Sequence, residues 1–369
     1  MFEVTPGDSL PTLSFDLVVK ILSRVPVKFL MQFQRVCKSW KSLISDAKFA
    51  KKHFRMSTTH HRLLLTSSKL SPKFVIADYP LSSVFTEVNP TATATKLECP
   101  LSNQHRLDHI VGSCHGIICI KLYQSFVIPW NPSIKKFKIL PTLKLPPSRN
   151  GYYTNYGFGY DHSTDTYKVV AFSWYETVIN GSRAKKSQVK VHTMGTSYWR
   201  KIQDFPGFPR TETGKFVSGT FNWFTYTNSA SKEIIVSLDL EKESYRKLLL
   251  PDYGAVVVVR SNLTVLMDCL CILCHSNTFL DVGLMKEYGN KDSWTKLFRF
   301  PYMGGVRSGP YVKALYVSED DQILLQYENE LAVFNSKDCT FKTLQIQNNN
   351  YWSVLDVCQE SLISPCSFW

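Results

Sequence analysis

Two cysteine-containing motifs are the parts of this chain whose residue types could do covalent or metal chemistry. Gly112-Ser-Cys-His-Gly116 has the spacing of a nucleophile elbow, in which Cys114 would attack and His115 would stand beside it. An elbow requires a helix immediately afterwards, whereas Ile117-Ile-Cys-Ile120 is typical of a strand. We therefore predict a turn that leads into a strand; a cysteine-dependent hydrolase or transferase is the alternative that a reactive Cys114 would support.

The second motif contains four possible zinc ligands, Cys269, Cys271, Cys274 and His275. It lacks a second ligand pair at zinc-site spacing, and its first two cysteines share one face of a predicted strand, where cysteine acts as a small apolar residue. The sequence contains no phosphate loop, paired-carboxylate motif or dinucleotide fingerprint. We therefore expect no metal site, no cofactor and no catalytic residue.

A basic stretch, Arg183, Lys185, Lys186 and Lys190, follows Asn180-Gly181. We predict a solvated hairpin loop between two strands here, with a nuclear-import patch as the alternative. The net charge is +13, but beyond residue 60 the excess is spread thinly and has no aromatic-basic recognition motif. The sequence therefore does not indicate a nucleic-acid partner.

These motifs lie in a body that repeats after residue 110. An aromatic residue near the start of a strand is followed by an apolar-Pro dipeptide that ends it. The instances are Trp130 to Leu140-Pro141, Trp199 to Phe205-Pro206, Tyr245 to Leu250-Pro251, Trp294 to Phe300-Pro301, and Phe341 without a proline. The first spacing is longer, and we expect an extra pair of strands in it, at Tyr156–Tyr160 and Tyr167–Phe172. The later spacings are all about 47 residues, which is the size of a propeller blade.

Short apolar or alternating runs between the markers predict further strands. They are Gly116–Ile120, Val189–His192, Ile234–Leu238, Cys269–Leu273, Ile323–Tyr327 and Leu331–Phe334. We predict a large all-β domain, a β-propeller of six to seven blades, with a β-sandwich as the alternative. The run His61–Thr66 would add a strand to the last blade and close the ring.

Ahead of this body, residues Leu10–Lys52 predict three short amphipathic helices. Ser14 is a suitable N-cap for a first helix over Phe15–Arg24, and Pro26 suits both its end and the start of the second helix. A segment this small buries too little apolar surface to be stable alone. Its surplus apolar face therefore indicates a docking module; the alternative is that the first helix packs on the rest of the chain.

The helical segment contains, in this order, Leu10-Pro11, Ile21-Leu22, Val25-Pro-Val27, Val36-Cys-Lys-Ser-Trp40 and Leu43-Ile-Ser-Asp46. In this order and spacing these residues resemble the F-box motif of plant F-box proteins. Arg35 and Ala47 depart from the residues that are common there. The resemblance implies binding to the Skp-type adaptor of cullin-based ubiquitin ligases. The implied contact residues are Leu10, Pro11, Leu17, Val18, Ile21, Leu22, Pro26, Val27, Leu30 and Val36, with Phe33, Trp40, Leu43 and Ile44 as the core of the module.

The body contains the segments Gly112–Cys119, Trp130-Asn-Pro-Ser133, Gly157-Phe-Gly-Tyr-Asp161 and Tyr167-Lys-Val-Val170. These segments are similar to the F-box-associated, kelch-type propeller domain of the same plant family. Only one glycine doublet of the kelch type, Gly304-Gly305, is present. The implied function is a substrate-recognition adaptor of a Skp–cullin–F-box ubiquitin ligase, which has no catalytic residues of its own. A non-ligase interaction scaffold is the alternative, and the target protein and its contacts are unknown.

The composition completes these expectations. Ten cysteines without a recognisable secretion signal indicate reduced thiols, and hence the cytoplasm, the nucleus or both. No apolar run is long enough for a transmembrane helix, so no membrane partner is expected. The expected organisation is a disordered N-terminus over residues 1–9, an F-box over 10–56, a propeller-like domain over 57–365 and a tail over 366–369.

Overall fold

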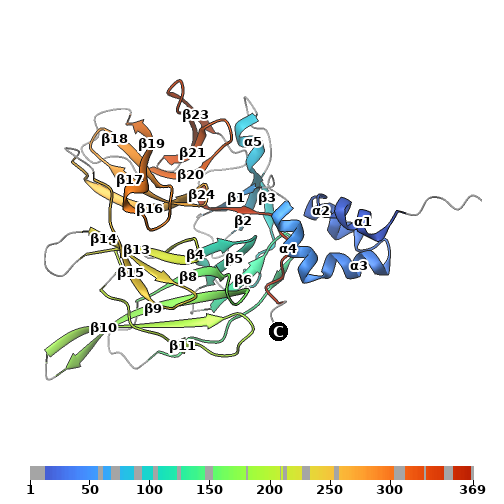
Figure 1. The fold of residues 1–369 in the computed structure, drawn as a ribbon, viewed down its shortest axis with the longest axis horizontal. Coiled ribbons are helices and arrows are strands. Elements are labelled where there is room, and N and C mark those ends of the chain that lie inside the picture. The colour runs from blue at the N-terminus through green and yellow to red at the C-terminus, as the bar shows by residue number, and fades with distance from the viewer. Residues whose placement is uncertain are drawn as a thin grey trace, which may run out of the picture.

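Six sheets of four antiparallel strands make up the body in the part of the chain that the structure describes. This computed structural model describes residues 13–56, 61–67, 75–86, 94–102, 107–122, 126–145, 153–179, 182–207, 209–210, 214–226, 233–252, 257–302, 312–327, 330–344 and 352–366. A head of helices is attached at one side of the sheets (Figure 1).

Each sheet is one blade, and its strands follow one another in the chain except in blade 1. Blade 1 is β24 (Trp352–Gln359), β1 (His61–Ser67), β2 (Val75–Pro80) and β3 (Thr95–Leu97), with α5 (Leu81–Thr86) after β2. Blade 2 is β4 (Leu107–Cys114), β5 (Ile117–Leu122), β6 (Phe126–Asn131) and β7 (Lys136–Phe137). Blade 3 is β8 (Tyr153–Asp161), β9 (Thr166–Ile179), β10 (Ser182–Thr193) and β11 (Arg200–Lys201).

The other three blades repeat the pattern. Blade 4 is β12 (Lys215–Val217), β13 (Thr220–Tyr226), β14 (Glu233–Asp239) and β15 (Tyr245–Leu248). Blade 5 is β16 (Arg260–Leu266), β17 (Cys269–His275), β18 (Phe279–Met285) and β19 (Trp294–Pro301), with the short 3-10 helix η1 (Lys291–Ser293) before β19. Blade 6 is β20 (Val312–Val317), β21 (Gln322–Tyr327), β22 (Glu330–Asn335) and β23 (Thr340–Leu344).

The blades form a closed ring. The first strand of each blade contacts the first strand of the next, in the order β24, β4, β8, β12, β16, β20 and back to β24. Such a ring of radially arranged sheets is a β-propeller. The predicted propeller is therefore confirmed with six blades, and the β-sandwich alternative is wrong.

The chain closes the ring with its two ends. His61–Ser67 pairs with the C-terminal strand β24, for example through Leu63 and Val357. Our prediction that residues 61–66 would close the ring is confirmed, with one difference. These residues do not join the last blade; instead the C-terminal strand enters the first blade as its innermost strand.

The aromatic markers lie on the outer strands, with one exception. Tyr245 and Trp294 begin β15 and β19, Trp199 directly precedes β11, and Phe341 lies in β23. Trp130 is different, because it lies in β6, the third strand of its blade. The strands predicted at Tyr156–Tyr160 and Tyr167–Phe172 are present as β8 and β9, but they are the first two strands of blade 3 and not an extra pair. The longer first spacing spans this offset and the long β9–β10 hairpin, whose strands contain 14 and 12 residues.

Apolar side chains pack between neighbouring blades. Between blades 5 and 6, Phe300 and Phe334 meet edge to face, with ring centroids 5.2 Å apart. Between blades 3 and 4, a Cβ added to Gly157 would lie 2.7 Å from the ring of Phe221. Glycine in β8 therefore leaves the room that the aromatic ring of the next blade needs.

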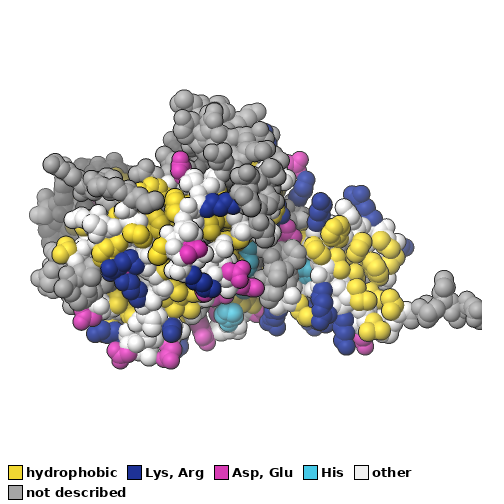
Figure 2. Space-filling view, turned by 90° about the horizontal axis from the view of Figure 1, so that it is seen from above, with side chains coloured by type: hydrophobic (Ala, Val, Ile, Leu, Met, Phe, Trp, Pro, Cys, Tyr) yellow, Lys and Arg dark blue, Asp and Glu magenta, His cyan; other side chains and the backbone are white. Residues whose placement is uncertain are grey.

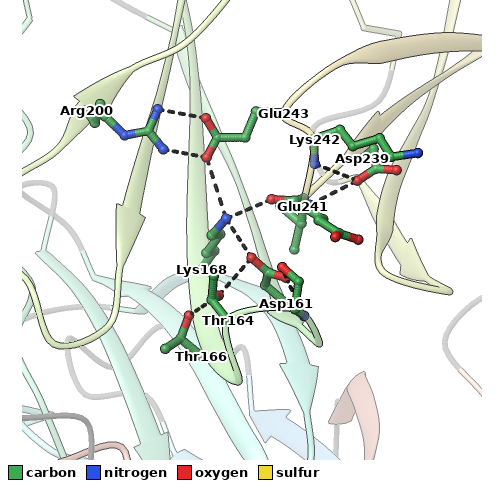
Figure 3. Close-up of polar contacts among 11 residues, drawn as sticks. Asp161, Thr164, Thr166, Lys168, Arg200, Asp239, Glu241, Lys242 and Glu243 are labelled. Atoms are coloured by element: carbon green, nitrogen blue, oxygen red, sulfur yellow. Dashed lines mark hydrogen bonds and ion pairs between the residues drawn. The ribbon is translucent and has the colours of Figure 1, made fainter.

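A buried ion cluster also joins blades 3 and 4 (Figure 3). Lys168 of β9 is buried, lies 2.8 Å from Asp161 and 3.5 Å from Glu243, and donates to the carbonyl of Leu240 at 2.7 Å. Burial alone would raise the pKa of Asp161, but hydrogen bonds from Lys168 and from Ser163 outweigh this and hold it well below its ordinary value. The carboxylates thus stay charged and hold two blades together.

The prediction of a loop at the basic stretch is wrong, because this stretch forms a strand. Arg183, Lys185, Lys186 and Lys190 all belong to β10, which pairs with β9 in one long hairpin. Residues 180 and 181, between the two strands, lie outside the described residues.

The helices of the head are α1 (Phe15–Leu22), α2 (Val27–Phe33), α3 (Lys38–Ser45) and α4 (Ala47–Met56). We predicted three helices over Leu10–Lys52, but the structure has a fourth, because the segment after Cys37 is divided into α3 and α4. Asp46 is extended, with ψ 133°, and its carboxylate accepts the N–H of Phe49 at 2.8 Å. An aspartate in this position is a favourable N-cap, so a fourth helix begins where we expected the third to end.

Among the described residues, no helix has both the length and the apolar character that crossing a membrane requires.

Candidate functional site

The local sequence of the head sets how its first two helices begin and end. Ser14 caps α1, because its side chain accepts the N–H of Leu17 at 3.4 Å, and Asp16 lies in the first turn. α1 ends at Leu22, two residues before the predicted end at Arg24. Pro26 is the N-cap of α2, as its fixed φ and missing N–H favour. The predicted cap and the predicted helix break are both confirmed.

The interior of the head uses one side of each helix. Leu22, Val27, Leu30 and Ile44 are buried, and Phe49 and Ala50 of α4 belong to the same apolar cluster. The rings of Phe33 and Trp40 lie 5.6 Å apart, and both side chains are half-buried, as is Leu43. Phe49 and Ala50 of α4 thus complete a core that α1–α3 share.

Large apolar side chains remain on the outside of the head. Val36 is 63 % exposed, Ile21 is 51 % exposed and Leu17 is 46 % exposed. Leu13, Phe15 and Phe29 are exposed to a similar degree. Figure 2 shows apolar side chains gathered over the head. We name this set, Leu13, Phe15, Leu17, Ile21, Phe29 and Val36, the head patch. A monomeric domain rarely exposes so many large apolar groups on one small module without an interface.

The implied contact residues fall into three groups in the structure. Leu17, Ile21 and Val36 belong to the head patch, whereas Val18 and Pro26 are half-buried. Leu22, Val27 and Leu30 are buried inside the head, where they pack beneath the helices that carry the head patch. Leu10 and Pro11 lie outside the described residues.

Sequence reasoning did not select Leu13, Phe15 and Phe29. Phe15 belongs to the second apolar side of the first helix, which the pattern already contained. Phe29 directly precedes Leu30, but only the packing of α2 shows that Leu30 turns inward and Phe29 outward.

Positive charge surrounds the head patch. The cations of residues 13–46, which are Lys20, Arg24, Lys28, Arg35, Lys38 and Lys41, are all exposed, and only Asp16 and Asp46 oppose them. Figure 2 shows Lys and Arg side chains beside the apolar ones on the head. An apolar centre with a charged rim is the usual anatomy of a protein interface, and this rim favours an acidic partner.

The helix α4 connects this head to the propeller. Lys51 pairs with Asp165 in the β8–β9 turn, and Tyr160 donates to the same carboxylate. Within the head, the imidazole Nε2 of His53 lies 2.8 Å from the carbonyl oxygen of Val25. The cluster that contains the head core also contains Ile117 of β5 and Leu362 near the C-terminus. A cleft of about 390 Å³ remains at this junction, lined by residues such as Met31, Lys48 and Ile134.

The elbow-like motif has the geometry of a structural turn. β5 begins at Ile117, so the predicted turn into a strand is confirmed. Burial raises the pKa of the Cys114 thiol far above its ordinary value. Burial also lowers the pKa of His115 to about 4, and its Nδ1 lies 3.0 Å from the hydroxyl of Tyr167 rather than beside a thiolate. A protonated thiol and a neutral, engaged imidazole do not make a nucleophile and base.

The cysteine-rich strand β17 is part of the blade core. Burial raises the pKa of Cys271 to about 12, and Cys274 is buried. His275 Nδ1 lies 2.7 Å from the hydroxyl of Tyr302, and burial lowers the pKa of this histidine to about 4. Across the described residues, no three His, Cys, Asp or Glu side chains are grouped so as to hold a metal ion.

Comparison with known proteins gives two family matches. Residues 10–52 match the F-box domain, and residues 54–266 match the F-box associated beta propeller domain. An F-box/kelch-repeat protein of Arabidopsis thaliana is 31% identical over 339 residues, which cover 89% of each chain. F-box protein CPR1 of the same plant is 25% identical over 379 residues, which cover 96% of this chain and 89% of CPR1.

Proposed function

Because this chain belongs to the family of F-box proteins with an associated β-propeller domain, we propose that it is the target-recognition adaptor of a Skp–cullin–F-box ubiquitin ligase. F-box proteins with a propeller generally act as such adaptors. The observation that carries the proposal is the head patch, a large apolar surface on a module that is otherwise packed and capped.

The head would dock on the Skp-type adaptor, and through it on a cullin. Leu17, Ile21 and Val36 would make the direct contacts, together with the neighbouring Phe15 and Phe29. Val18 and Pro26 would lie at the border, and Leu10 and Pro11 would extend the contact. Leu22, Val27 and Leu30 would act by holding α1 and α2 in place, because they are buried in the free chain. The cationic rim would steer an acidic adaptor surface and make association faster at low salt.

The contribution to catalysis would be proximity. The adaptor holds the head, the propeller holds a target protein, and a ubiquitin-loaded enzyme bound elsewhere in the ligase meets that target at high effective concentration. The packed junction at α4 supports this role, since it keeps the target at a constant position relative to the adaptor. This role requires no side chain of this protein to make or break a covalent bond.

A pull-down with the Skp-type adaptor tests the proposal. Ile21→Asp places a charge in the centre of the head patch and is expected to weaken binding by at least about 2 kcal/mol, because central apolar contacts dominate interface energies. Val257→Asp is the matched control, because Val257 is 77 % exposed on the propeller. Equal binding by Ile21→Asp and the unaltered chain would exclude the head patch as the docking surface.

The half-life of a bound target separates the ligase adaptor from a scaffold. Proteins that co-purify with the chain while degradation is blocked provide candidate targets. If their half-lives are the same with and without this protein, the scaffold is the better description. We also propose a cytoplasmic or nuclear location, which is supported by ten cysteines that are all free thiols.

A further inference from the structure

The longest hairpin of the propeller has an outer edge that its own blade leaves largely uncovered. β10 contains twelve residues, whereas the strand outside it, β11, contains two and pairs only with Lys190 and Val191. In Figure 1 the far ends of β9 and β10 extend beyond the neighbouring blades. Within the described residues, no strand pairs with the outer side of residues 182–188.

The hydrogen-bond pattern shows which backbone groups face outward. Ile202 donates its N–H to the carbonyl of Val189 at 3.0 Å, so Val189 faces β11. In an antiparallel ladder, alternate residues face alternate neighbours, and the β9–β10 pairing contains no register shift. The N–H and C=O groups of Arg183, Lys185 and Ser187 therefore face outward, while those of Lys186 and Gln188 pair with β9. We name the outward backbone groups of residues 183, 185 and 187 the free edge.

The charge on this stretch of β10 has one sign, although Glu176 of β9 lies opposite Lys185 in the ladder. Residues 183–190 contain four basic residues and no acidic one. Lys186 is exposed, and Lys190 donates to the carbonyl of Lys144, a further exposed lysine. Exposed lysines on an edge strand are also a known means of preventing unwanted pairing, which is the alternative explanation of this feature. The two explanations differ in one expectation: a binding edge should pair with an acidic strand, whereas an edge that only prevents pairing should not.

We propose that the free edge of β10 binds an extended, acidic segment of the target protein as an added strand. Main-chain hydrogen bonds to residues 183, 185 and 187 would supply affinity, and carboxylates beside Lys186 and Lys190 would supply selectivity. Positive charge on the strand repels basic segments, so the same charges that prevent self-pairing select the partner. This inference rests on the proposed function, because it names the class of target segment that the propeller presents.

A defined probe tests the proposal on the full chain bound to its Skp-type adaptor. The probe is a fluorescein-labelled octapeptide of alternating Val and Glu, and its basic counterpart alternates Val and Lys. We expect the acidic probe to raise fluorescence anisotropy on titration and the basic one to have no effect. Ser187→Pro removes one outward N–H without touching the β9 ladder and should weaken the acidic probe at least about tenfold. Lys186→Glu should weaken it severalfold, whereas Lys247→Glu, on the outer strand of the next blade, should not.

The pattern of amide exchange distinguishes strand addition from attraction between charges alone. On binding, the N–H groups of Lys185 and Ser187 should gain protection, while that of Lys186 was protected already. Absence of acidic-probe binding, equal binding by Ser187→Pro with an unchanged melting temperature, or uniform protection would each overturn the proposal. If the melting temperature of Ser187→Pro is lowered, the test rests on Lys186→Glu, which leaves the backbone N–H groups in place. Equal acidic-probe binding by Lys186→Glu and the unaltered chain would then overturn the proposal.

Failure here is distinguishable from failure of the proposed function. Every protein in the titration is first captured through the Skp-type adaptor. If the chain is captured but does not bind the acidic probe, only the free-edge proposal is contradicted. If the chain is not captured, the adaptor role is contradicted.

Discussion

The ring of Phe54, near the end of α4, packs on the ring of His115 in the β4–β5 turn, with centroids 5.0 Å apart. His115 in turn contacts Tyr160 at 4.8 Å between centroids and lies within hydrogen-bond distance of Tyr167. One side chain of the head is thus connected to two blades of the propeller. The Gly112–Gly116 motif, which has the spacing of a nucleophile elbow, is therefore a contact between the head and the propeller.

Phe54→Ala should weaken the contact between the head and the propeller. Removing a half-buried ring should lower the free energy of unfolding by about 1–3 kcal/mol, and the head should reorient relative to the propeller. Urea denaturation measures the first effect, and small-angle X-ray scattering measures the second as a larger radius of gyration. Phe29→Ala is the control, because that ring is exposed. Identical scattering and stability for Phe54→Ala and the parent would contradict the role of this contact.

Lys168→Met should destabilise the propeller strongly. The substitution leaves Asp161 without its cation in a buried site, whereas Glu243 keeps its pair with Arg200. Breaking a buried ion pair in this way typically costs about 3–5 kcal/mol. Lys242→Met, which alters an exposed lysine in the adjacent turn, should change stability by less than about 0.5 kcal/mol. Urea denaturation of both variants gives the comparison. Equal midpoints would show that the cluster contributes nothing.

His275→Gln should flatten the dependence of stability on pH between 6.5 and about 4. Burial lowers the pKa of this histidine from 6.5 to about 4 in the folded chain. Below pH 6.5 the unfolded chain therefore binds a proton that the folded chain does not, and stability falls as pH falls through this window. Glutamine can keep a hydrogen bond to Tyr302 without titrating. Midpoints in urea at several pH values measure the slope, and equal slopes for variant and parent would refute the assignment.

Native thiol labelling should modify Cys37 before Cys114. The Ser39 hydroxyl, 3.1 Å away, and the backbone N–H of Trp40 lower the pKa of the exposed Cys37, whereas burial raises that of Cys114. Because the thiolate is the reactive form, iodoacetamide should label Cys37 in the folded chain and Cys114 only after unfolding. Peptide mass spectrometry identifies the labelled sites. Early labelling of Cys114 would revive the hydrolase alternative.

Features that depend on neighbouring residues were predictable from the sequence. Ser14 and Pro26 mark the start of α1 and α2 because caps and proline act within one helical turn. The strands around Ile234 and Ile323 were found because burial on a sheet selects short apolar runs. The sequence predicted the number of blades only as six to seven, since Trp130 resembles the other aromatic markers but lies on the third strand of its blade.

Features that depend on distant residues were not predictable. The burial of Leu30 beside the exposed Phe29 is set by how the helices pack, which a single-helix pattern does not contain. The partners of Lys168 stand 7 and 75 residues away in the chain, so no local motif announces the cluster. The pairing of β1 with β24 spans nearly 300 residues and follows only from closure of the ring.

That closure has a consequence for the order in which the protein is made. α1–α4 leave the ribosome before the propeller, whereas blade 1 must wait for its inner strand β24, which is synthesised after the other five blades. Asn131 of blade 2 also waits, because its amide donates to the carbonyls of Ser361 and Ile363 at 2.9 and 2.8 Å. A nascent or prematurely terminated chain therefore exposes the head patch before it has a complete ring, and only translation through β24 completes the propeller that the head is attached to.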